Sequence, residues 1–401
     1  MVRRAAALRS RMGGHNVASH TVIVTWKRAA LAPFAATGLS VIAAGLLACA
    51  SGSEPIALGL AGPVSDPRGA SMRLAAELAV AEINRAGGVR GRRLELVVQD
   101  DSAQPEVAVA TARALYANRR VVAVVGHLTS GATLAAAPVY GGRRPLPVIS
   151  PSASAPAVTD AGPHVFRVCP TDVAHGAALA EFAARRLGAR RAAILYQNDE
   201  YGRGIRGTFA DEFTRLGGHL VSDDPYVPDL PGFEPYLRRL QRQGGADVLL
   251  IAGTAASARR ILPALDTVGL RPRVMGGDAL ASLETARGTD GVITSTAYLP
   301  DRPGARNQAF VEAYRGAYGS QPLDHRGAAA YDIVYLLARA IEAVGPNRSR
   351  LNAYLAGVGT ASPSFEGVTG RIAFDPQGDV PAKTVALGVI RNGAVVTAED
   401  R

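Results

Sequence analysis

From residue 56 onward, short apolar segments rich in β-branched residues alternate with longer segments of amphipathic, helical spacing. The short segments predict strands at residues 56–60, 94–99, 121–126, 147–149, 165–168, 191–196, 219–221, 247–252 and 273–276. The longer segments predict helices at residues 70–86, 105–118, 131–140, 173–187, 204–216, 233–243, 255–268, 305–318 and 327–344. Strands that alternate with helices of this length form parallel sheets covered by helices, so we expect a doubly wound α/β fold.

The alternation runs through two blocks of similar content, residues 54–170 and 171–297. Two long helices and a final strand pair, at residues 370–374 and 384–391, follow these blocks. Two α/β lobes are the natural interpretation. Ligands of such sheets bind at the carboxyl ends of the strands, often in a cleft between lobes.

The net charge of +10 does not indicate a nucleic-acid partner. Six of the basic residues lie in the first 48 residues, which contain no Asp or Glu. No later segment interleaves basic with aromatic residues in the manner of a nucleic-acid-binding surface. With 401 residues and 48% hydrophobic content, the chain can instead bury the cores of two or three globular domains.

Residues 1–48 have the features of a secretory signal peptide, since Lys27-Arg28 precede an apolar run at residues 29–48. The run ends in Leu46-Leu47-Ala48-Cys49, which resembles a bacterial lipobox, where cleavage leaves an N-terminal cysteine that carries acyl chains. We therefore expect lipidation of Cys49, a flexible tether at residues 49–53 and anchoring to the extracytoplasmic side of the cell membrane. The alternative is an uncleaved anchor helix, because about 20 apolar residues can just span a bilayer.

Cys169 is the only cysteine other than Cys49, so the exported body has no partner with which it could form an internal disulfide. It follows a predicted strand, and we expect a small buried core residue there rather than a catalytic thiol.

The motifs of common enzyme classes are missing. Ala382 stands where a phosphate-binding loop ending in Lys383 would need glycine, no Gly-x-Ser-x-Gly occurs in the body, and the histidines are scattered. We expect no catalytic activity, no cofactor and no bound metal.

Residues 202–207 (Gly-Arg-Gly-Ile-Arg-Gly) match the Gly-x-Gly-x-x-Gly pattern of dinucleotide sites, with Asp223 and Asp224 downstream. Five residues separate the first glycine from the preceding strand, whereas a dinucleotide site needs it at the strand end. We expect a helix start with permissive glycines, and a dinucleotide-dependent enzyme is the alternative.

Polar turns follow several predicted strands. Asp100-Asp101 could serve acid–base chemistry, but carboxylates at such positions usually cap the next helix or face solvent. Residues 126–131 and 150–156 combine serine hydroxyls with free backbone N–H groups next to helix starts. These turns favour binding of a small carboxylate, and ordinary helix capping is the alternative for each.

The body, residues 54–401, resembles the bacterial type I periplasmic binding proteins of the leucine/isoleucine/valine class, which serve ABC importers. The resemblance rests on residues 62–64 (Gly-Pro-Val), 81–91 (with Ile-Asn-Arg-Ala-Gly-Gly-Val-Arg-Gly), Asp100-Asp101, 126–130, 149–156, Tyr201-Gly202, 275–278 and Tyr331-Asp332. It implies two Rossmann-like lobes that are joined by three crossovers and close on a ligand. The N-terminal lobe would comprise residues 54–171 and 298–374, and the C-terminal lobe residues 172–297 and 375–401.

The resemblance also implies roles for individual residues. Ser130, Ser152 and Ser154 match positions that hold the α-carboxylate of the ligand, and Tyr201 matches an aromatic residue that closes over it. Asp278 matches an acidic residue that pairs with the α-ammonium, a charge-assisted interaction of about 1.5–3 kcal/mol.

Three positions depart from the pattern of branched-chain amino-acid binders. Thr254 stands where a tyrosine is often found, which removes one wall of the pocket. Arg68 and Arg326 lie near positions that are often apolar or aromatic. If either guanidinium points inward, a polar or anionic ligand side chain would be preferred, whereas the alternative is that both face solvent at the mouth of the cleft.

We therefore predict a monomeric, lipid-anchored binding protein that captures an amino acid or related small carboxylate and delivers it to an ABC permease and its ATPase. The alternatives are a ligand-sensing protein of the same fold and an importer component for an amide, a dicarboxylate or an aromatic acid.

Overall fold

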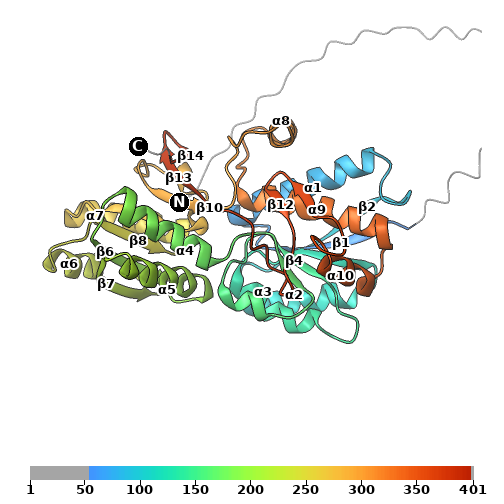
Figure 1. Cartoon of the computed structure of the whole chain (residues 1–401), viewed down its shortest axis with the longest axis horizontal. Coiled ribbons are helices and arrows are strands. Elements are labelled where there is room, and N and C mark those ends of the chain that lie inside the picture. The colour runs from blue at the N-terminus through green and yellow to red at the C-terminus, as the bar shows by residue number, and fades with distance from the viewer. Residues whose placement is uncertain (1–53, 399–401) are drawn as a thin grey trace, which may run out of the picture. The chain divides into compact units, whose positions relative to one another are not determined.

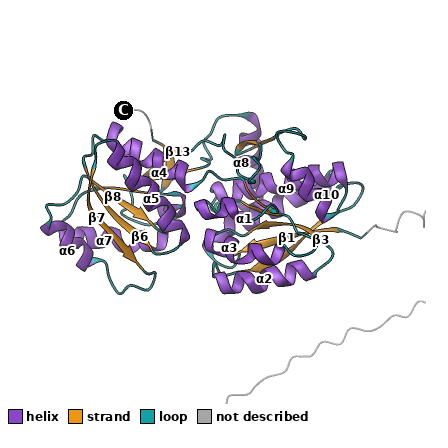
Figure 2. Ribbon diagram, turned by 60° about the horizontal axis from the view of Figure 1, so that its bottom comes forward, coloured by secondary structure: helices purple, strands orange, loops and turns teal. Residues whose placement is uncertain are grey.

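The computed structural model describes residues 54–398, and the two large sheets within them are each covered by helices on both faces (Figures 1 and 2). The first sheet has five parallel strands in the order β2-β1-β3-β4-β5. Its strands are β1 (Ile56–Gly62), β2 (Leu94–Asp100), β3 (Val121–Gly126), β4 (Val148–Ser150) and β5 (Val165–Arg167).

The second sheet has seven strands in the order β14-β13-β10-β9-β8-β6-β7. Its members are β6 (Arg191–Gln197), β7 (His219–Tyr226), β8 (Val248–Ala252), β9 (Arg273–Gly276), β10 (Ile293–Thr296), β13 (Ala386–Arg391) and β14 (Ala394–Thr397). The strands from β6 to β10 are parallel, and β13 and β14 add an antiparallel edge.

Ten α-helices connect the strands in the described part of the chain. They are α1 (Pro67–Arg85), α2 (Pro105–Ala117), α3 (Ser130–Tyr140), α4 (Asp172–Glu181), α5 (Glu200–Arg215), α6 (Glu234–Arg242), α7 (Ala255–Val268), α8 (Ala305–Tyr318), α9 (His325–Val344) and α10 (Arg348–Ala356). A π-helical turn, Phe182–Arg186, continues α4.

The side-chain period of the strands explains how each sheet is covered. In β1, Ile56, Leu58 and Leu60 pack against α1 and α9, whereas Ala57 and Ala61 face α2 and α3. The second sheet is covered in the same way, by α6 and α7 on one face and by α4 and α5 on the other. Strands buried on both faces read as continuous apolar runs, which is why they stand out in the sequence.

The chain crosses between the elements of the two sheets three times (Figure 1). It passes to the second sheet between β5 and α4 and returns between β10 and α8, since α8 and α9 pack against α1 beside the first sheet. It crosses again before β13, which pairs with β10.

The expected final strand pair is wrong. Residues 370–372 form β12 (Gly370–Ile372), which pairs with β11 (Phe365–Gly367) in a hairpin of its own. The later strand, β13, pairs instead with β10 and β14, neither of which was predicted. The two segments are adjacent in sequence but belong to different sheets.

Cys169 is a free, fully buried cysteine directly after β5, and burial raises the pKa of its thiol to about 12, so it is an inert core residue as expected. Within residues 54–398, no helix has both the length and the apolar character to span a bilayer. The signal peptide and Cys49 lie outside the described residues.

Candidate functional site

A cavity of about 300 Å³ lies where elements of the two sheets meet. The strand ends that precede it belong to both sheets, as expected for ligand sites of doubly wound folds. The residues around it include most of the predicted site residues, namely Arg68, Ser130, Ser152, Tyr201, Thr254, Asp278 and Arg326.

Helix starts bring these side chains together. Arg68, Ser130, Tyr201 and Arg326 each lie in the first turn of a helix, and Thr254 is the N-cap of α7. The capping residues Asp66, Thr129, Asp199 and Asp324 accept hydrogen bonds from backbone N–H groups of these turns, which fixes where the helices α1, α3, α5 and α9 begin. Five helix N-termini therefore converge on the cavity, and their dipoles favour a negative charge there.

Both arginines line the cavity rather than only its solvent margin. The side chain of Arg326 is 6% exposed and its Nη1 lies 3.2 Å from the carboxylate of Asp324. The side chain of Arg68 is 40% exposed and its Nε lies 2.9 Å from the carboxylate of Asp66. Each guanidinium is thus paired with the N-cap aspartate of its own helix.

The turns that follow β3 and β4 are tied to each other. The hydroxyl of Ser130 accepts a hydrogen bond from the backbone N–H of Ala155 at 3.1 Å, and Ser150 donates to the carbonyl of His127 at 2.7 Å. Ser152 faces the cavity at the middle of the second turn. Ser154 is fully buried beside Asp172 and is absent from the cavity lining.

Asp278 is the most buried charged group of the cavity. It lies at the start of a short 3₁₀ helix after β9 and is 2% exposed. Burial by itself would raise the pKa of Asp278, but the nearby His175 and His325 hold that pKa well below its usual range. Oδ2 of Asp278 lies 3.4 Å from Nε2 of His325, so the carboxylate is ionised and already faces an imidazole.

Tyr201 closes the second-sheet side of the cavity. Its hydroxyl accepts a hydrogen bond from the backbone N–H of Ala279 at 3.1 Å, and burial raises the pKa of the phenol well above its usual value. The ring therefore stays neutral and is fixed next to Asp278.

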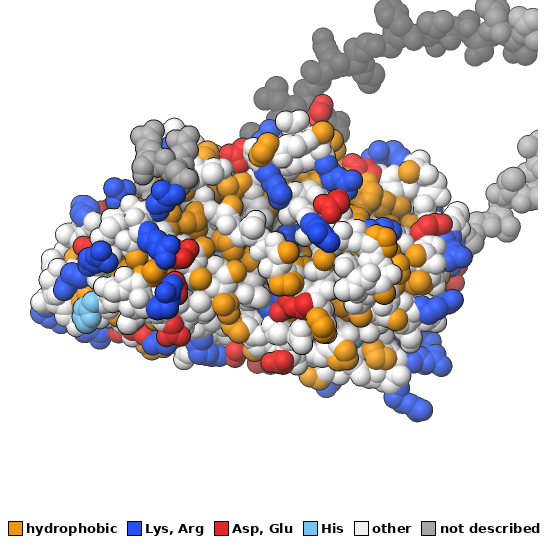
Figure 3. Space-filling view, viewed as in Figure 1, with side chains coloured by type: hydrophobic (Ala, Val, Ile, Leu, Met, Phe, Trp, Pro, Cys, Tyr) orange, Lys and Arg blue, Asp and Glu red, His pale blue; other side chains and the backbone are white. Residues whose placement is uncertain are grey.

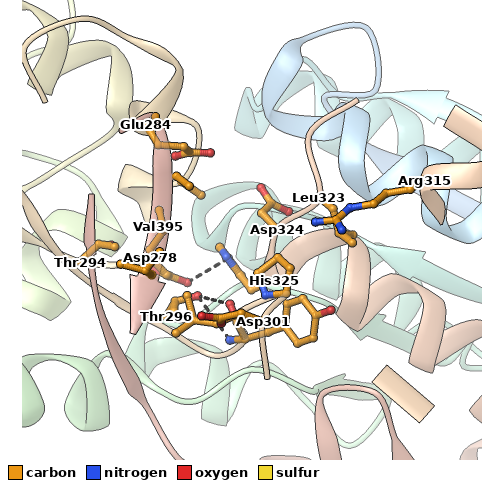
Figure 4. Close-up of a pocket in the computed structure, with 17 residues that line it drawn as sticks. Asp278, Glu284, Thr294, Thr296, Asp301, Arg315, Leu323, Asp324, His325 and Val395 are labelled. Carbon is orange, nitrogen blue, oxygen red and sulfur yellow. Dashed lines mark hydrogen bonds and ion pairs between the residues drawn. The ribbon is translucent and has the colours of Figure 1, made fainter. Parts of the chain in front are cut away.

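A second cavity, of about 460 Å³, shares Asp278 with the first one (Figure 4). Asp278, Glu284, Asp301 and Asp324 line it, together with Arg315 and His325. In Figure 4 the imidazole of His325 stands between these carboxylates and points toward Asp278. Asp278 lines both cavities, whereas His325 lines the second cavity and contacts Ser152, which lines the first.

Three residues near the carboxylate of Asp278 were not predicted from the sequence, namely His325, His175 and Asp172. His325 and His175 are both buried, and Nδ1 of His175 lies 2.9 Å from the hydroxyl of Ser295. Burial, reinforced by the charge of Asp278, raises the pKa of Asp172 well above its usual value. The Asp172-x-x-His175 spacing at the start of a predicted helix, with both side chains on one face, was the available signal.

The expectation for Asp100-Asp101 is wrong for the second residue. Asp101 is fully buried, and its Oδ2 lies 2.6 Å from Nδ1 of His127, whose Nε2 in turn lies 3.0 Å from the hydroxyl of Tyr140. A buried carboxylate requires a partner, and here the partner is His127. Their contact ties the turn after β2 to the turn after β3. The residues of this network are absent from the lining of the 300 Å³ cavity.

The glycine pattern at residues 202–207 lies within the first turns of α5, as the helix-start interpretation expected. A Cβ at Gly202 would lie 2.0 Å from the carbonyl oxygen of Gln197, so glycine allows the helix to approach the preceding strand end. Asp223 is part of β7 and pairs with Arg206. Within residues 54–398, no cluster of His, Cys, Asp and Glu side chains could hold a metal ion.

Comparison with known proteins identifies the family of the chain. A family model described as "Periplasmic binding protein" matches residues 55–394. A Leu-, Ile-, Val-, Thr- and Ala-binding protein of Pseudomonas aeruginosa is 30% identical over 344 residues, which cover 84% of this chain and 90% of that protein.

Solved structures agree with this match. An ABC transporter substrate-binding protein of Desulfitobacterium hafniense in complex with Leu has a TM-score of 0.74 and 34% identity, covering 86% of this chain and all of that one. A solute-binding protein of R. palustris in complex with benzoate has a TM-score of 0.76 and 25% identity, covering 86% of this chain and 96% of that one.

The fold and the cavity define a two-sheet binding protein. The chain belongs to the periplasmic binding protein family, of the type I, branched-chain amino-acid class, which confirms the resemblance and the fold class. This is a family of substrate-binding proteins that serve transporters, so the chain is a binding protein and not an enzyme.

Proposed function

We propose that this chain is the substrate-binding component of an ABC importer and that it binds an amino acid or a related small carboxylate in the 300 Å³ cavity. One observation carries the proposal: side chains from distant parts of the sequence, expected to contact such a ligand, line one cavity at which five helix N-termini meet. Donor groups and dipoles of that kind favour a carboxylate.

In this proposal the ligand carboxylate lies against the turns that carry Ser130, Ser152 and Ser154, and Tyr201 covers it from the other lobe. Asp278 accepts hydrogen bonds from the ammonium of an amino acid. Thr254 leaves room beside the ligand side chain, and Arg68 and Arg326 favour a polar or anionic one.

The two lobes, residues 54–171 with 298–374 and residues 172–297 with 375–401, would close on the ligand and present it to a permease with its ATPase. We further propose export by the signal peptide, a monomeric state and anchoring of the cell-surface protein through acylated Cys49. The variant Cys49→Ser should be released from membranes. Persistent membrane attachment of this variant would indicate an uncleaved anchor instead.

The ligand can be found by calorimetry on the exported body with amino acids, amides, dicarboxylates and aromatic acids. Asp278→Asn should weaken binding of the best amino acid about ten- to a hundredfold, the loss expected for one charge-assisted hydrogen bond. Glu284→Gln is the matched control, because Glu284 lines only the second cavity. Unchanged affinity in Asp278→Asn would contradict the ammonium role.

An aromatic carboxylate is the second candidate ligand, because the R. palustris relative was crystallised with benzoate. Benzoate binding that exceeds that of every amino acid in the panel, and that Asp278→Asn does not weaken, would favour this candidate.

A further inference from the structure

His325, the first residue of α9, stands between two groups expected to hold the ligand. Its Nε2 lies 3.1 Å from the hydroxyl oxygen of Ser152 and 3.4 Å from Oδ2 of Asp278, and the residue is 2% exposed. One ring nitrogen thus faces both the turn assigned to the carboxylate and the carboxylate assigned to the ammonium.

The chemistry of these contacts determines what His325 does there. An ionised carboxylate only accepts hydrogen bonds, so Nε2 must carry a proton to interact favourably with Asp278. The imidazole then offers Asp278 an N–H donor, and in its protonated form also a positive charge. The ammonium of an amino acid would offer the same carboxylate a donor and a positive charge as well.

We propose that His325 competes with the ammonium of the ligand for Asp278 and thereby sets the preference of the site between an α-amino acid and the same acid without its amino group. This inference rests on the proposed function. An acid without an amino group can bind to the serine turns while the Asp278–His325 pair stays intact. An amino acid must displace the imidazole or share the carboxylate with it.

A protonated His325 and the ligand ammonium would be two cations beside one buried carboxylate, which is why they compete for it. The groups around His325 belong to several elements. They are Ser152 after β4, His175 on α4, Asp278 after β9, Glu284, Asp301 and Arg315 around the second cavity, and the chain neighbours Asp324 and Arg326.

Among these groups, His175 also contributes to the low pKa of Asp278, but it is absent from the lining of both cavities, whereas His325 lines the second cavity and contacts Ser152. His325 should therefore weaken amino-acid binding while leaving the acid without an amino group unaffected.

The test compares matched pairs of ligands that differ by one amino group: leucine with 4-methylpentanoate, phenylalanine with 3-phenylpropanoate and glutamate with glutarate. Isothermal titration gives the affinity ratio within each pair for the wild-type protein and the variants.

Two variants separate the position of the ring from its charge. His325→Ala should shift the ratio toward the amino acid by about tenfold or more, the change expected when one charge-assisted competitor is lost. His325→Gln keeps a neutral amide donor without the charge, so its ratio should lie between those of wild type and His325→Ala. His164→Gln, which changes a buried histidine that contacts the carbonyl of Ala137, is the matched control and should leave the ratio unchanged.

The outcomes distinguish this inference from the function on which it rests. Amino-acid binding whose pairwise ratio is the same in wild type, His325→Ala and His325→Gln would overturn the inference and leave the proposed function intact. If no member of any pair binds to wild type or variants, both the inference and the proposed function are wrong.

Discussion

Arg167, the last residue of β5, should be the most sensitive polar position in the first lobe. Its side chain is fully buried, and its Nε and Nη2 lie 2.6 and 2.8 Å from the two carboxylate oxygens of Asp379. The remaining N–H groups donate to the carbonyls of Ala153 and Ala155 and to the hydroxyl of Thr159. One guanidinium therefore joins the turn that carries Ser152 to the segment before β13.

Arg167→Met removes the charge and keeps most of the volume. It leaves the carboxylate of Asp379, whose side chain is 12% exposed, without its cation, and it removes the hydrogen bonds that Arg167 donates to the carbonyls of Ala153 and Ala155. Removal of one partner of a buried ion pair costs about 3–5 kcal/mol, so the free energy of unfolding should fall by that amount. The exposed Arg120, which pairs with Glu95, is the control, and Arg120→Met should cost less than about 1 kcal/mol.

Urea unfolding followed by far-ultraviolet circular dichroism measures both losses, because the single tryptophan of the chain, Trp26, lies in the leader. The double variant Arg167→Met with Asp379→Asn should be less destabilised than the sum of the single variants, since it leaves no unpaired charge. A loss below about 1 kcal/mol in Arg167→Met would refute the assignment of a structural role to this pair.

Two further predictions concern backbone packing and pH. Gly204→Ala should destabilise the protein by about 1–2 kcal/mol, because the new Cβ would lie 2.4 Å from Oδ2 of Asp172. Gly207 lies in the same helix, but a Cβ at this position would have no neighbour within 4 Å, so Gly207→Ala should stabilise the protein by about 0.5–1 kcal/mol. Equal effects in urea unfolding would contradict this argument. Burial lowers the pKa of Lys383 to about 8, below its usual value of 10.5. The folded state gives up this proton first, so the free energy of unfolding should rise with pH from about 8 to about 10.5, by about 3 kcal/mol from this group. Lys383→Met should lose that rise, and parallel pH profiles of wild type and variant would show that the lysine is not buried as a cation.

The elements that were predicted best from the sequence are those with clear breaks at both ends. The predicted bounds of β3, β9, α7 and α8 match the structure, because each is an apolar or amphipathic segment between clear breaks. The strand predicted at residues 219–221 extends to Tyr226. It is an edge strand that pairs only with β6, and its Asp223 and Asp224 form ion pairs with Arg206 and Arg239. Because these residues are polar, the second half of the strand lacks the apolar pattern by which strands are predicted.

The site residues were predictable where they follow a strand end or match a family motif. His325 was missed because helix α9 was expected to begin at residue 327. Asp324 is a strong N-cap signal, and applying it would have placed His325 in the first turn of the helix, beside Arg326. Its contacts with Ser152 and Asp278 join parts of the chain that are far apart in sequence, and such contacts leave no local pattern.

The pairing of the cavity arginines changes what they contribute to selectivity. A free guanidinium would attract an anionic side chain strongly, but Arg68 and Arg326 each share a carboxylate that also caps their own helix. An anionic ligand must therefore compete with Asp66 and Asp324 for the same donors, or bind to N–H groups left over on the far side of the guanidinium. Because the charges enter the cavity as neutral pairs, the helix N-termini and the serine hydroxyls provide the net attraction for the ligand carboxylate. When a ligand binds, the two arginines and their aspartates lose hydrogen bonds to water. An apolar ligand side chain cannot replace these hydrogen bonds, so the arginines discriminate mainly against an apolar side chain.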